Sequence, residues 1–366
     1  MIRVLQVFAS LNMGGAESRM MDVYRYIDRN EIQFDFLTMQ LEEQYYEDEI
    51  RRLGGRVIKI AAPRDSGTLQ NLKELTKIMR EGKYDVVHAH TSYHCGMVML
   101  AAKRAKIPVR ISHSRTTGSK RQGKKTQLML KLGRFLINRF ATCRLAISWE
   151  AGIYLFGKKQ FTVLPNAIDL RKYEQVDDAS IAALKAEFHI ADSDIVFGQV
   201  GRFDVMKNHQ FTIKIFSALY KKCPNAKLFL IGDGPLRKQC EEEAAKLDCA
   251  DRIIFTGVRS DVCHWMHIFH KLLVPSLYEG LGGVILEGQA AGIPVLKSDS
   301  FTDAADLGLG LVSRCKLNDI EDWLTKLETS AERPEKSCIV QGFYDKGYSL
   351  DASISTLTGI YYGWYD

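Results

Sequence analysis

The chain lacks any apolar run long enough to cross a membrane. None of its stretches approaches the roughly 20 consecutive apolar residues that a spanning helix needs. The opening MIRVLQVFASLN has no small-residue cleavage site, so it is expected to be a first strand and not a secretory leader. These absences favour a soluble, cytoplasmic protein, and 366 residues are enough for two domains.

Patterns typical of disulfide frameworks and metal sites are also missing. The eight cysteines include no CxxC pair and no regular spacing, which predicts reduced thiols. Histidines cluster at residues 264–270 and 88–94, but neither cluster has HExxH or a comparable zinc spacing. We therefore expect no metal site in either cluster.

The glycine fingerprint of dinucleotide-binding folds is absent from the first strand–helix turn. Gly14 and Gly15 end the first predicted strand, but GGAES lacks GxGxxG spacing, which counts against a nicotinamide enzyme. The two glycines allow a tight turn and a close approach of the backbone to a ligand. A turn needed only for packing explains them equally well.

What the sequence does contain is an alternation of strands and helices that runs twice. The first series continues to about residue 150, and the pattern restarts at IVFGQVG after a polar stretch ending at residue 194. Within the first series, one predicted helical face carries Leu69, Leu72, Leu75 and Met79. Apolar strands between helices predict two doubly wound α/β domains, whose ligands bind at the carboxyl ends of parallel strands.

Two carboxylates and two cations are placed at such strand ends. In YEGLGGVILEGQAAGIPV, Glu279 precedes a predicted helix and Glu287 lies inside it. The glycines between them expose the N–H groups of the helix terminus, which can seat phosphate oxygens. Upstream, GRFDVMKNH supplies Arg202 and Lys207, two cations suited to a diphosphate. Each feature alone is more often a solvated surface charge, but together they predict a nucleotide-sugar pocket.

The motifs along the chain resemble those of one enzyme family. The segments that carry the resemblance are GGAES at 14–18, YDVVHAH at 84–90, VRISHS at 109–114, AIS at 146–148, LPNAID at 164–169, GRFDVMKNH at 201–209, IGDGPLR at 231–237, IIFTGVRSDV at 253–262 and LVPSLYEGLGGVILEGQAAGIPV at 273–295. They are similar to the family-4 (group 1) retaining glycosyltransferases, especially the bacterial enzymes that build exopolysaccharide and capsule.

The resemblance implies the GT-B fold, in which two Rossmann-like domains face a cleft. Residues 1–165 would form the acceptor-side domain and residues 166–345 the domain that binds the nucleotide-sugar. In that family the last helix returns to the N-terminal domain, and residues 346–366 are the candidate here. The aromatic residues of this tail are explained at least as well by core packing.

The resemblance also assigns roles to individual residues. His113 would position the transferred sugar, Glu279 would hold sugar hydroxyls, and Arg202 and Lys207 would stabilise the diphosphate without a metal ion. The predicted donor-binding residues are Gly14, Gly15, Val258, Leu281, Gly282, Gly283 and Glu287, the last of them on the ribose. UDP is the expected nucleotide, because it is the commonest donor among the resembling enzymes, and no cofactor is expected.

A basic segment predicts a second surface. From Arg115 to Arg144 the chain has nine Lys or Arg and no acidic residue. A predicted helix in this segment sets apolar residues among the charges, the pattern of a helix that lies on anionic lipid. The residues concerned are Lys120, Arg121, Lys124, Lys125, Leu128, Lys131, Arg134 and Phe135. A solvated basic face explains them equally well, and nucleic acid is disfavoured because no recognition module accompanies the charge.

Two other functions stay open at this point. A nucleotide-sugar epimerase could share the fold, although the paired cations and carboxylates favour a transferase. A non-catalytic nucleotide-sugar-binding partner of another transferase is also compatible with the motifs. Release of free nucleoside diphosphate from nucleotide-sugars would distinguish these functions. The sequence favours a transferase acting on a glycan acceptor, which is expected to be lipid-linked if the basic helix meets a membrane.

Overall fold

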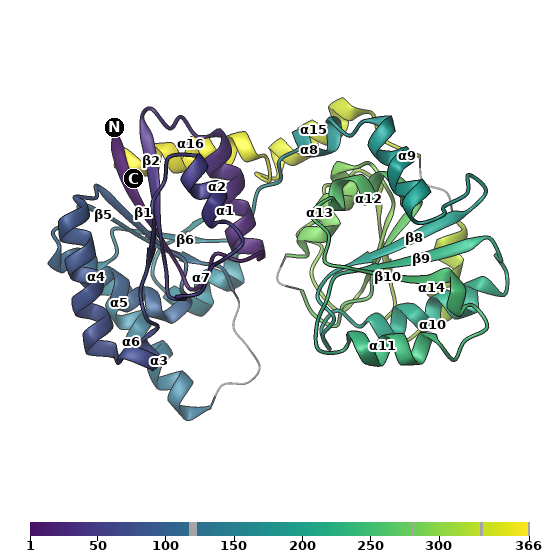
Figure 1. Cartoon of the computed structure of the whole chain (residues 1–366), viewed down its shortest axis with the longest axis horizontal. Coiled ribbons are helices and arrows are strands. Elements are labelled where there is room, and N and C mark those ends of the chain that lie inside the picture. Colours follow the sequence, from purple (N-terminus) through teal and green to yellow (C-terminus); the bar gives the residue numbers. More distant parts are fainter. Residues whose placement is uncertain (117–122, 280, 330–331, 365–366) are drawn as a thin grey trace. The chain divides into compact units, whose positions relative to one another are not determined.

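The chain forms two compact units, which are described separately below. The structure is a computed structural model that describes residues 1–116, 123–279, 281–329 and 332–364, without the side chains of Lys124 and Lys125 (Figure 1). One unit consists of Met1–Ala167 and Leu350–Asp366, and the other of Ile168–Ser349. Each unit has its own sheet and its own hydrophobic clusters.

The described residues of the first unit form a seven-stranded sheet in the order β3-β2-β1-β4-β5-β6-β7. All of its strand pairs are parallel. The strands are β1 (Ile2–Phe8), β2 (Ile32–Thr38), β3 (Val57–Lys59), β4 (Val86–Ala89), β5 (Val109–Ser114), β6 (Cys143–Ala146) and β7 (Thr162–Val163). The strand order reverses between β1 and β4, where ligands of open α/β sheets bind.

Helices cover both faces of this sheet. Along β1, Val4 joins one hydrophobic cluster and Leu5 joins the other, because successive side chains of a strand point to opposite faces. The first cluster includes side chains from α1 (Gly15–Tyr26), α2 (Glu47–Arg52) and α16 (Leu350–Tyr361). The second is covered by α4 (Thr68–Gly82), α5 (Cys95–Arg104), α6 (Lys124–Phe140) and α7 (Trp149–Phe156). Short helical turns lie at α3 (Pro63–Ser66) and η1 (Ser92–His94).

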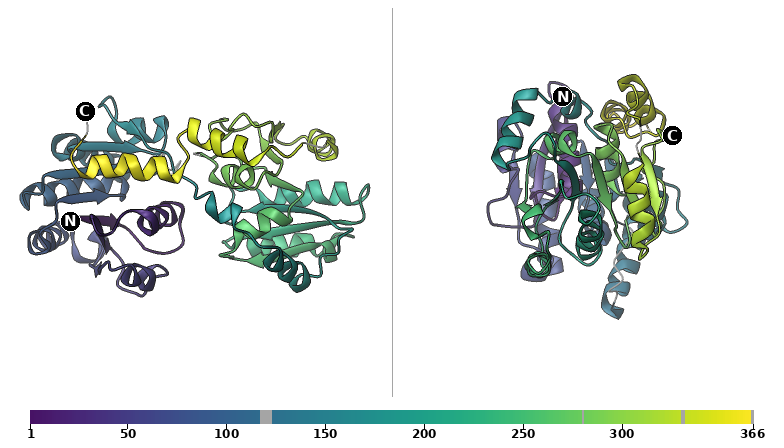
Figure 2. Two further views of the ribbon diagram at one scale, coloured as in Figure 1. Left: turned by 90° about the horizontal axis from the view of Figure 1, so that it is seen from above. Right: turned by 90° about the vertical axis from the view of Figure 1, so that its right-hand side faces the viewer.

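The C-terminal helix α16 therefore packs in the first unit, although the second unit precedes it in sequence. Figure 2 shows this yellow helix running along the strands and helices of the N-terminal part. Leu357, Ile360 and Tyr361 are buried in the cluster that α1 also covers. Tyr361 meets Phe34 of β2 edge to face, with ring centroids 5.7 Å apart.

The second unit repeats the architecture with a six-stranded parallel sheet in the order β10-β9-β8-β11-β12-β13. Its strands are β8 (Ile195–Val200), β9 (Ala226–Ile231), β10 (Ile253–Gly257), β11 (Lys271–Val274), β12 (Val295–Ser298) and β13 (Val312–Cys315). Its helices are α8 (Arg171–Glu174), α9 (Asp178–Glu187), α10 (His209–Tyr220), α11 (Arg237–Ala244), η2 (Ala250–Arg252), α12 (Val262–Ile268), α13 (Gly283–Ala290), α14 (Ile320–Glu328) and α15 (Lys336–Asp345). Here the strand order reverses between β8 and β11.

The predicted α/β alternation is confirmed, whereas one predicted core position is wrong. Leu72, Leu75 and Met79 of α4 are buried against the sheet, but Leu69 is 75% exposed. Leu69 lies in the first turn of α4, which begins at Thr68. Periodicity predicts which face of a helix turns inward, but the length of that face depends on how far the sheet extends beneath it.

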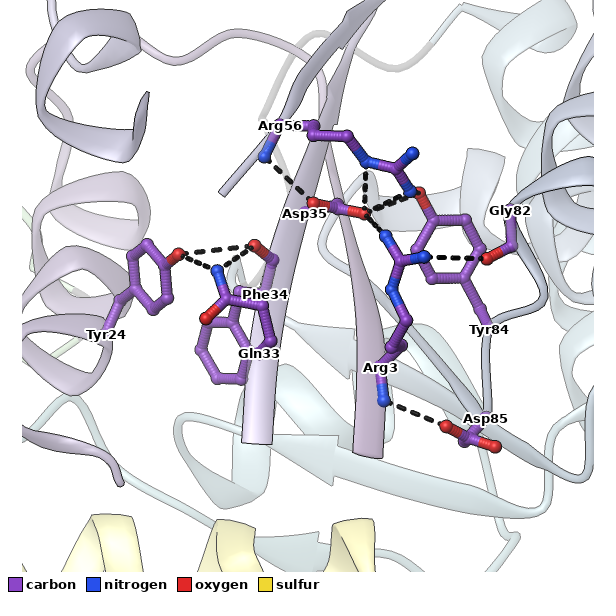
Figure 3. A network of polar contacts seen from close by, with 9 residues as sticks. All are labelled: Arg3, Tyr24, Gln33, Phe34, Asp35, Arg56, Gly82, Tyr84 and Asp85. Atoms are coloured by element: carbon purple, nitrogen blue, oxygen red, sulfur yellow. Dashed lines mark hydrogen bonds and ion pairs between the residues drawn. The ribbon is translucent and has the colours of Figure 1, made fainter. Parts of the chain in front are cut away.

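A buried carboxylate ties the first strands of the first unit together (Figure 3). Asp35 on β2 is 2% exposed. Its Oδ2 accepts hydrogen bonds from Arg3 at 2.6 Å, Arg56 at 2.7 Å and Tyr84 at 2.9 Å, and its Oδ1 accepts the backbone N–H of Arg56 at 2.8 Å. Burial acts to raise the pKa of Asp35, but the bonds from Arg56 and Tyr84 outweigh it, so the pKa lies below the usual 3.8.

We predict that Asp35→Asn lowers the free energy of unfolding by about 2 kcal/mol at pH 7, because charge-assisted hydrogen bonds are lost. The folded carboxyl has the lower pKa, so its contribution is complete above pH 3.8 and disappears as the pH falls through the folded-state value. Urea titrations of wild type and variant at pH 7 and at pH 3 would measure both effects. Asp65→Asn, at an exposed ion pair with Arg64, is the control. A difference that stays constant with pH would contradict this role for Asp35.

Candidate active site

The loop between β8 and α10 carries Arg202 and Lys207, and its own polar groups fix its shape. Asp204 Oδ1 accepts the backbone N–H groups of Met206 at 2.9 Å and of Lys207 at 3.1 Å. From β8, Gln199 Nε2 donates to the Lys207 carbonyl at 2.7 Å. The position of Lys207 is therefore set through its backbone.

The same loop is joined to the end of the neighbouring strand β11. Asn208 has a φ of 55°, a left-handed conformation that asparagine adopts more readily than most residues. Its Nδ2 donates to the carbonyl of Pro275, just after β11, at 3.1 Å. Because the strand order of this sheet reverses between β8 and β11, these two loops lie where a ligand is expected.

Lys207 and Glu279, which come from these two loops, form an ion pair. Lys207 Nζ lies 2.6 Å from Glu279 Oε1, and Ser276 Oγ donates to the same oxygen at 2.7 Å. The side chains of the pair are 24% and 12% exposed, so it is half-buried but reachable. The sequence predicted that each of these residues contacts the ligand, but it did not reveal the ion pair between them.

Glu279 is followed closely by the N-terminus of α13. Gly282 is its N-cap residue, with a φ of 78° that favours glycine, while Gly283 begins the helix in open space. Among the described residues no side chain caps this terminus. Leu281 is buried. The first N–H groups of α13 can therefore donate hydrogen bonds to an anion.

The other predicted donor-site residues of the second unit lie at the same carboxyl edge of the sheet or in α13. Arg202 is exposed in the loop after β8. Val258, directly after β10, is 63% exposed. Glu287 lies within α13 and is partly buried. One residue that the sequence did not single out is Gly201, where an added Cβ would lie 3.3 Å from carbons of the Lys207 side chain.

In the first unit, His113 belongs to a buried group of three histidines at the ends of β4 and β5. His88 Nε2 and His113 Nδ1 are 3.1 Å apart, and the two rings lie within 3° of parallel. His90 stacks on Phe8, with ring centroids 4.2 Å apart. All three histidines are less than 9% exposed. In the described part of the chain, their ring nitrogens form the one group of potential metal ligands within 4.8 Å of one another.

These histidines are neutral near pH 7. Burial lowers the pKa values of His88, His90 and His113 well below 6.5, and the nearby positive charge of Arg115 lowers them further. Arg115 is partly buried, and its desolvation lowers its pKa to about 10, so it remains a cation at neutral pH. Neither Arg115 nor Tyr361, which donates or accepts beside His88, was among the predicted site residues. Arg115 follows VRISHS directly, so its position after a strand was the available signal.

Gly14 and Gly15 lie at the N-terminus of α1, as predicted. Gly14 has an extended backbone that any residue can adopt, but an added Cβ would collide with the Glu17 carboxylate. No atom lies within 4 Å of the position a Cβ would take on Gly15. Burial raises the pKa of Glu17, against the effects of a backbone hydrogen bond and of Arg115. The carboxylate of Glu17 therefore occupies space beside Gly14.

In the 264–270 cluster, His267 and His270 form hydrogen bonds with the backbone. His267 Nε2 lies 2.8 Å from the Tyr173 carbonyl, and His270 Nδ1 accepts the Val196 N–H at 3.0 Å. In the 88–94 cluster, His94 does not belong to the group formed by His88, His90 and His113. The sequence did not indicate that His113 joins His88 and His90, because it lies on the adjacent parallel strand β5 and not near them in the chain.

The basic helix α6 presents apolar side chains to solvent. Leu128 and Phe135 are 67% and 65% exposed, and Lys131 is exposed beside them. The prediction that Arg134 shares this surface is wrong, because Arg134 is half-buried and its Nη2 donates to the Tyr154 carbonyl of α7. Lys120 and Arg121 lie outside the described residues, as do the side chains of Lys124 and Lys125. None of the helices in the described ranges combines the length and apolar character needed to cross a bilayer.

The two glycines of α13 allow a matched test of this helix terminus. We predict that Gly282→Ala destabilises the second unit by about 1 kcal/mol or more, because a positive φ strains residues with a Cβ. Gly283→Ala is the control and should change the free energy of unfolding by less than about 0.5 kcal/mol. Urea denaturation would measure both. Equal losses would show that the terminus is not built as described.

Comparison with known proteins identifies the family. Residues 13–172 match the family described as Glycosyltransferase Family 4, and residues 180–307 match Glycosyl transferases group 1. The chain is 36% identical over 369 residues to a protein of Bacillus subtilis (strain 168) named as glycosyltransferase EpsF, covering 98% of this chain and 96% of that protein. It is 24% identical over 242 residues to the UDP-Gal:alpha-D-GlcNAc-diphosphoundecaprenol alpha-1,3-galactosyltransferase of Escherichia coli, covering 63% and 62% of the two chains.

A solved structure shows the same fold. Anabaena Alr3699/HepE in complex with UDP and glucose superposes with a TM-score of 0.77 and 19% identity, covering 98% of each chain. The two parallel-sheet α/β units are those of the GT-B fold, as predicted. The chain belongs to the group 1, family 4 glycosyltransferases and is a transferase enzyme.

Proposed function

We propose that this glycosyltransferase moves a sugar from a UDP-sugar to a growing, lipid-linked polysaccharide and retains the anomeric configuration. The observation that carries the proposal is the ion pair between Lys207 and Glu279, whose Nζ and Oε1 atoms are 2.6 Å apart. Glu279 lies three residues before Gly282, the N-cap of α13. A cation, a carboxylate and free helix N–H groups match the phosphates and hydroxyls of a nucleotide-sugar.

The cations would act on the leaving group. Breaking the bond between sugar and phosphate leaves negative charge on the distal phosphate. Arg202, Lys207 and the first N–H groups of α13 would stabilise that charge as it develops. In this proposal they replace a divalent metal ion, so the reaction requires none.

The carboxylates would hold the hydroxyl groups of the donor. Glu279 accepts hydrogen bonds from Lys207 and Ser276 through one oxygen, which orients its carboxylate. We assign Glu279 to the transferred sugar and Glu287, farther along α13, to the ribose. Val258, Leu281, Gly282 and Gly283 would line the nucleotide, and we retain Gly14 and Gly15 as proposed donor-binding residues.

UDP is favoured as the nucleotide by what two of the similar proteins bind or use. HepE was solved with UDP and glucose, and the Escherichia coli relative is named for a UDP-galactose donor. The name of that relative also specifies an acceptor linked to lipid, a GlcNAc-diphosphoundecaprenol. His113 would position the transferred sugar, and the acceptor would attack from the face of the leaving group, which retains configuration.

We predict that Arg202→Ala and Lys207→Ala each lower the turnover rate by on the order of 100-fold or more, because each removes positive charge from the leaving phosphate. Lys214→Ala is the matched control, since Lys214 is an exposed cation on α10. Initial rates of nucleoside diphosphate release, with melting temperatures to verify folding, would measure the effect. Near-normal turnover in either site variant would exclude the proposed donor site.

The lipid-linked acceptor is supported by the exposed face of α6. Leu128, Leu132 and Phe135 are all exposed and lie at i, i+4 and i+7 on one side of the helix. Lys131 and Arg139 are exposed next to them. We propose that this face rests on the anionic surface of the cytoplasmic leaflet, with apolar side chains inserted and cations against lipid headgroups. The enzyme would then be cytoplasmic and peripheral to the membrane.

We predict that the protein sediments with anionic vesicles and much less with neutral ones, and that attachment weakens between 0.1 M and 1 M salt as the Debye length falls from about 10 Å to about 3 Å. Each cation near the surface contributes about 1 kcal/mol, so Lys131/Arg139→Glu should abolish the preference. Lys73/Lys77→Glu, on the exposed side of α4, is the charge-matched control. Equal binding of the two double variants would show that α6 is only a solvated face.

A further inference from the structure

A continuous chain of hydrogen bonds links Arg115 to His113 through the interior of the first unit. Between these two residues it passes through four buried side chains: His90, Gln6, Tyr361 and His88. A guanidinium can only donate hydrogen bonds. The direction of the first hydrogen bond is therefore fixed, and the protons of the other side chains follow from the partners of each one.

The first half of the chain runs from Arg115 to Tyr361. Arg115 Nε donates to His90 Nδ1 at 3.2 Å, so the neutral His90 carries its proton on Nε2. His90 Nε2 lies 2.9 Å from Gln6 Oε1, which accepts that proton's hydrogen bond. Gln6 Nε2 in turn donates to the Tyr361 hydroxyl at 3.1 Å.

The second half runs from Tyr361 to His113. Among the described residues, the Tyr361 hydroxyl has hydrogen bonds only with Gln6 Nε2, which donates to it, and with His88 Nδ1, 2.9 Å away. His88 Nδ1 is therefore the acceptor for the Tyr361 proton. His88 must then carry its proton on Nε2, and it donates to His113 Nδ1 at 3.1 Å. His113 is left with its proton on Nε2.

Among the residues that the structure describes, this last N–H lacks a hydrogen-bond partner of ordinary geometry. His113 Nε2 is buried and makes no hydrogen bond to any residue that the structure describes, and the nearby Leu164 carbonyl only partly offsets the lowering of the His113 pKa. His113 lines a small pocket with Arg19, Arg115, Leu164 and Asn166. Arg115 is anchored there by a hydrogen bond from its Nη1 to Asn166 Oδ1 at 2.7 Å. A buried donor without a partner destabilises the folded protein, and a hydrogen bond to an incoming oxygen would remove that cost.

We propose that Tyr361 is a positioning residue that, through His88, fixes His113 as the Nε2–H tautomer, so that His113 offers a hydrogen-bond donor to an oxygen of the sugar substrate. This inference rests on the proposed role of His113 in holding the sugar. It adds that His113 binds a ligand oxygen as a donor and does not act as a general base. The C-terminal helix α16 thereby contributes to the site, because its Tyr361 sets the tautomer of His113 on β5.

The experiment measures the tautomers of the full-length protein labelled with ¹⁵N-histidine, without any substrate. Two-bond ¹⁵N–¹H correlations at pH 7, assigned with His88→Gln and His113→Gln variants, distinguish Nδ1–H from Nε2–H. In the wild type, His88, His90 and His113 should all be Nε2–H. A His113 that carries its proton on Nδ1, or that is doubly protonated at pH 7, would overturn the proposal.

The isosteric variant Tyr361→Phe removes only the hydroxyl. His88 then loses the donor that holds its Nδ1 unprotonated, so His113 should become a mixture of tautomers and kcat/KM should fall by about tenfold. Tyr362→Phe is the matched control, because the next residue in sequence also loses a phenolic hydroxyl, one that donates to Glu31 at 2.7 Å on the surface. Unchanged His113 tautomers in Tyr361→Phe would refute the role of Tyr361. Correct tautomers in a wild type that consumes no nucleotide-sugar would instead reject the proposed function alone.

Discussion

All neighbouring strands in both sheets of the described structure run parallel, and this constraint decides where chemistry can be placed. The central strands are covered by helices on both faces, so they carry mainly apolar side chains. Polar groups gather at the carboxyl ends, where loops leave the sheet. Lys207 and Glu279 meet because β8 and β11 are adjacent there, although 72 residues separate them in sequence. His88 and His113 meet in the same way at the ends of β4 and β5.

The same parallel packing buries polar groups that must then satisfy each other. Asp35 is compensated by two guanidinium groups and a tyrosine, which together join β1, β2 and the segment before β4. The histidine group is held neutral by burial and by Arg115, and its hydrogen bonds are ordered by a donor that cannot reverse. The first network contributes stability, because every partner of the carboxylate is present. In the described part of the chain, the second leaves the Nε2–H of His113 without a hydrogen-bond partner, which is the donor that we propose meets a sugar oxygen.

The sequence predicted the fold class because apolar strands, helical periodicity and turn residues agree along most of the chain. It also located Arg202, Lys207, Glu279 and Gly282 at strand ends or at a helix terminus. It could not predict that Lys207 pairs with Glu279, because side-chain pairing depends on strand order, which the motifs do not encode. Core packing explains the aromatic residues of the C-terminal tail at least as well as a role in the site, and the sequence does not reveal that the Tyr361 hydroxyl bridges Gln6 and His88. The exposure of Leu69 and the inward contact of Arg134 likewise depend on neighbouring elements, namely the extent of the sheet under α4 and the position of α7.

The central claim is that the chain transfers a sugar from a UDP-sugar to a lipid-linked acceptor with retention. The most direct measurement supplies a UDP-sugar ¹³C-labelled at the anomeric carbon, with and without a polyprenyl-diphosphate-linked acceptor. NMR then follows free UDP and the configuration at the labelled carbon in the product. The account predicts release of UDP that depends on the acceptor, in equal amount to a glycoside with the anomeric configuration of the donor. An inverted product, a sugar altered without the acceptor, or no turnover with any nucleotide-sugar would contradict it.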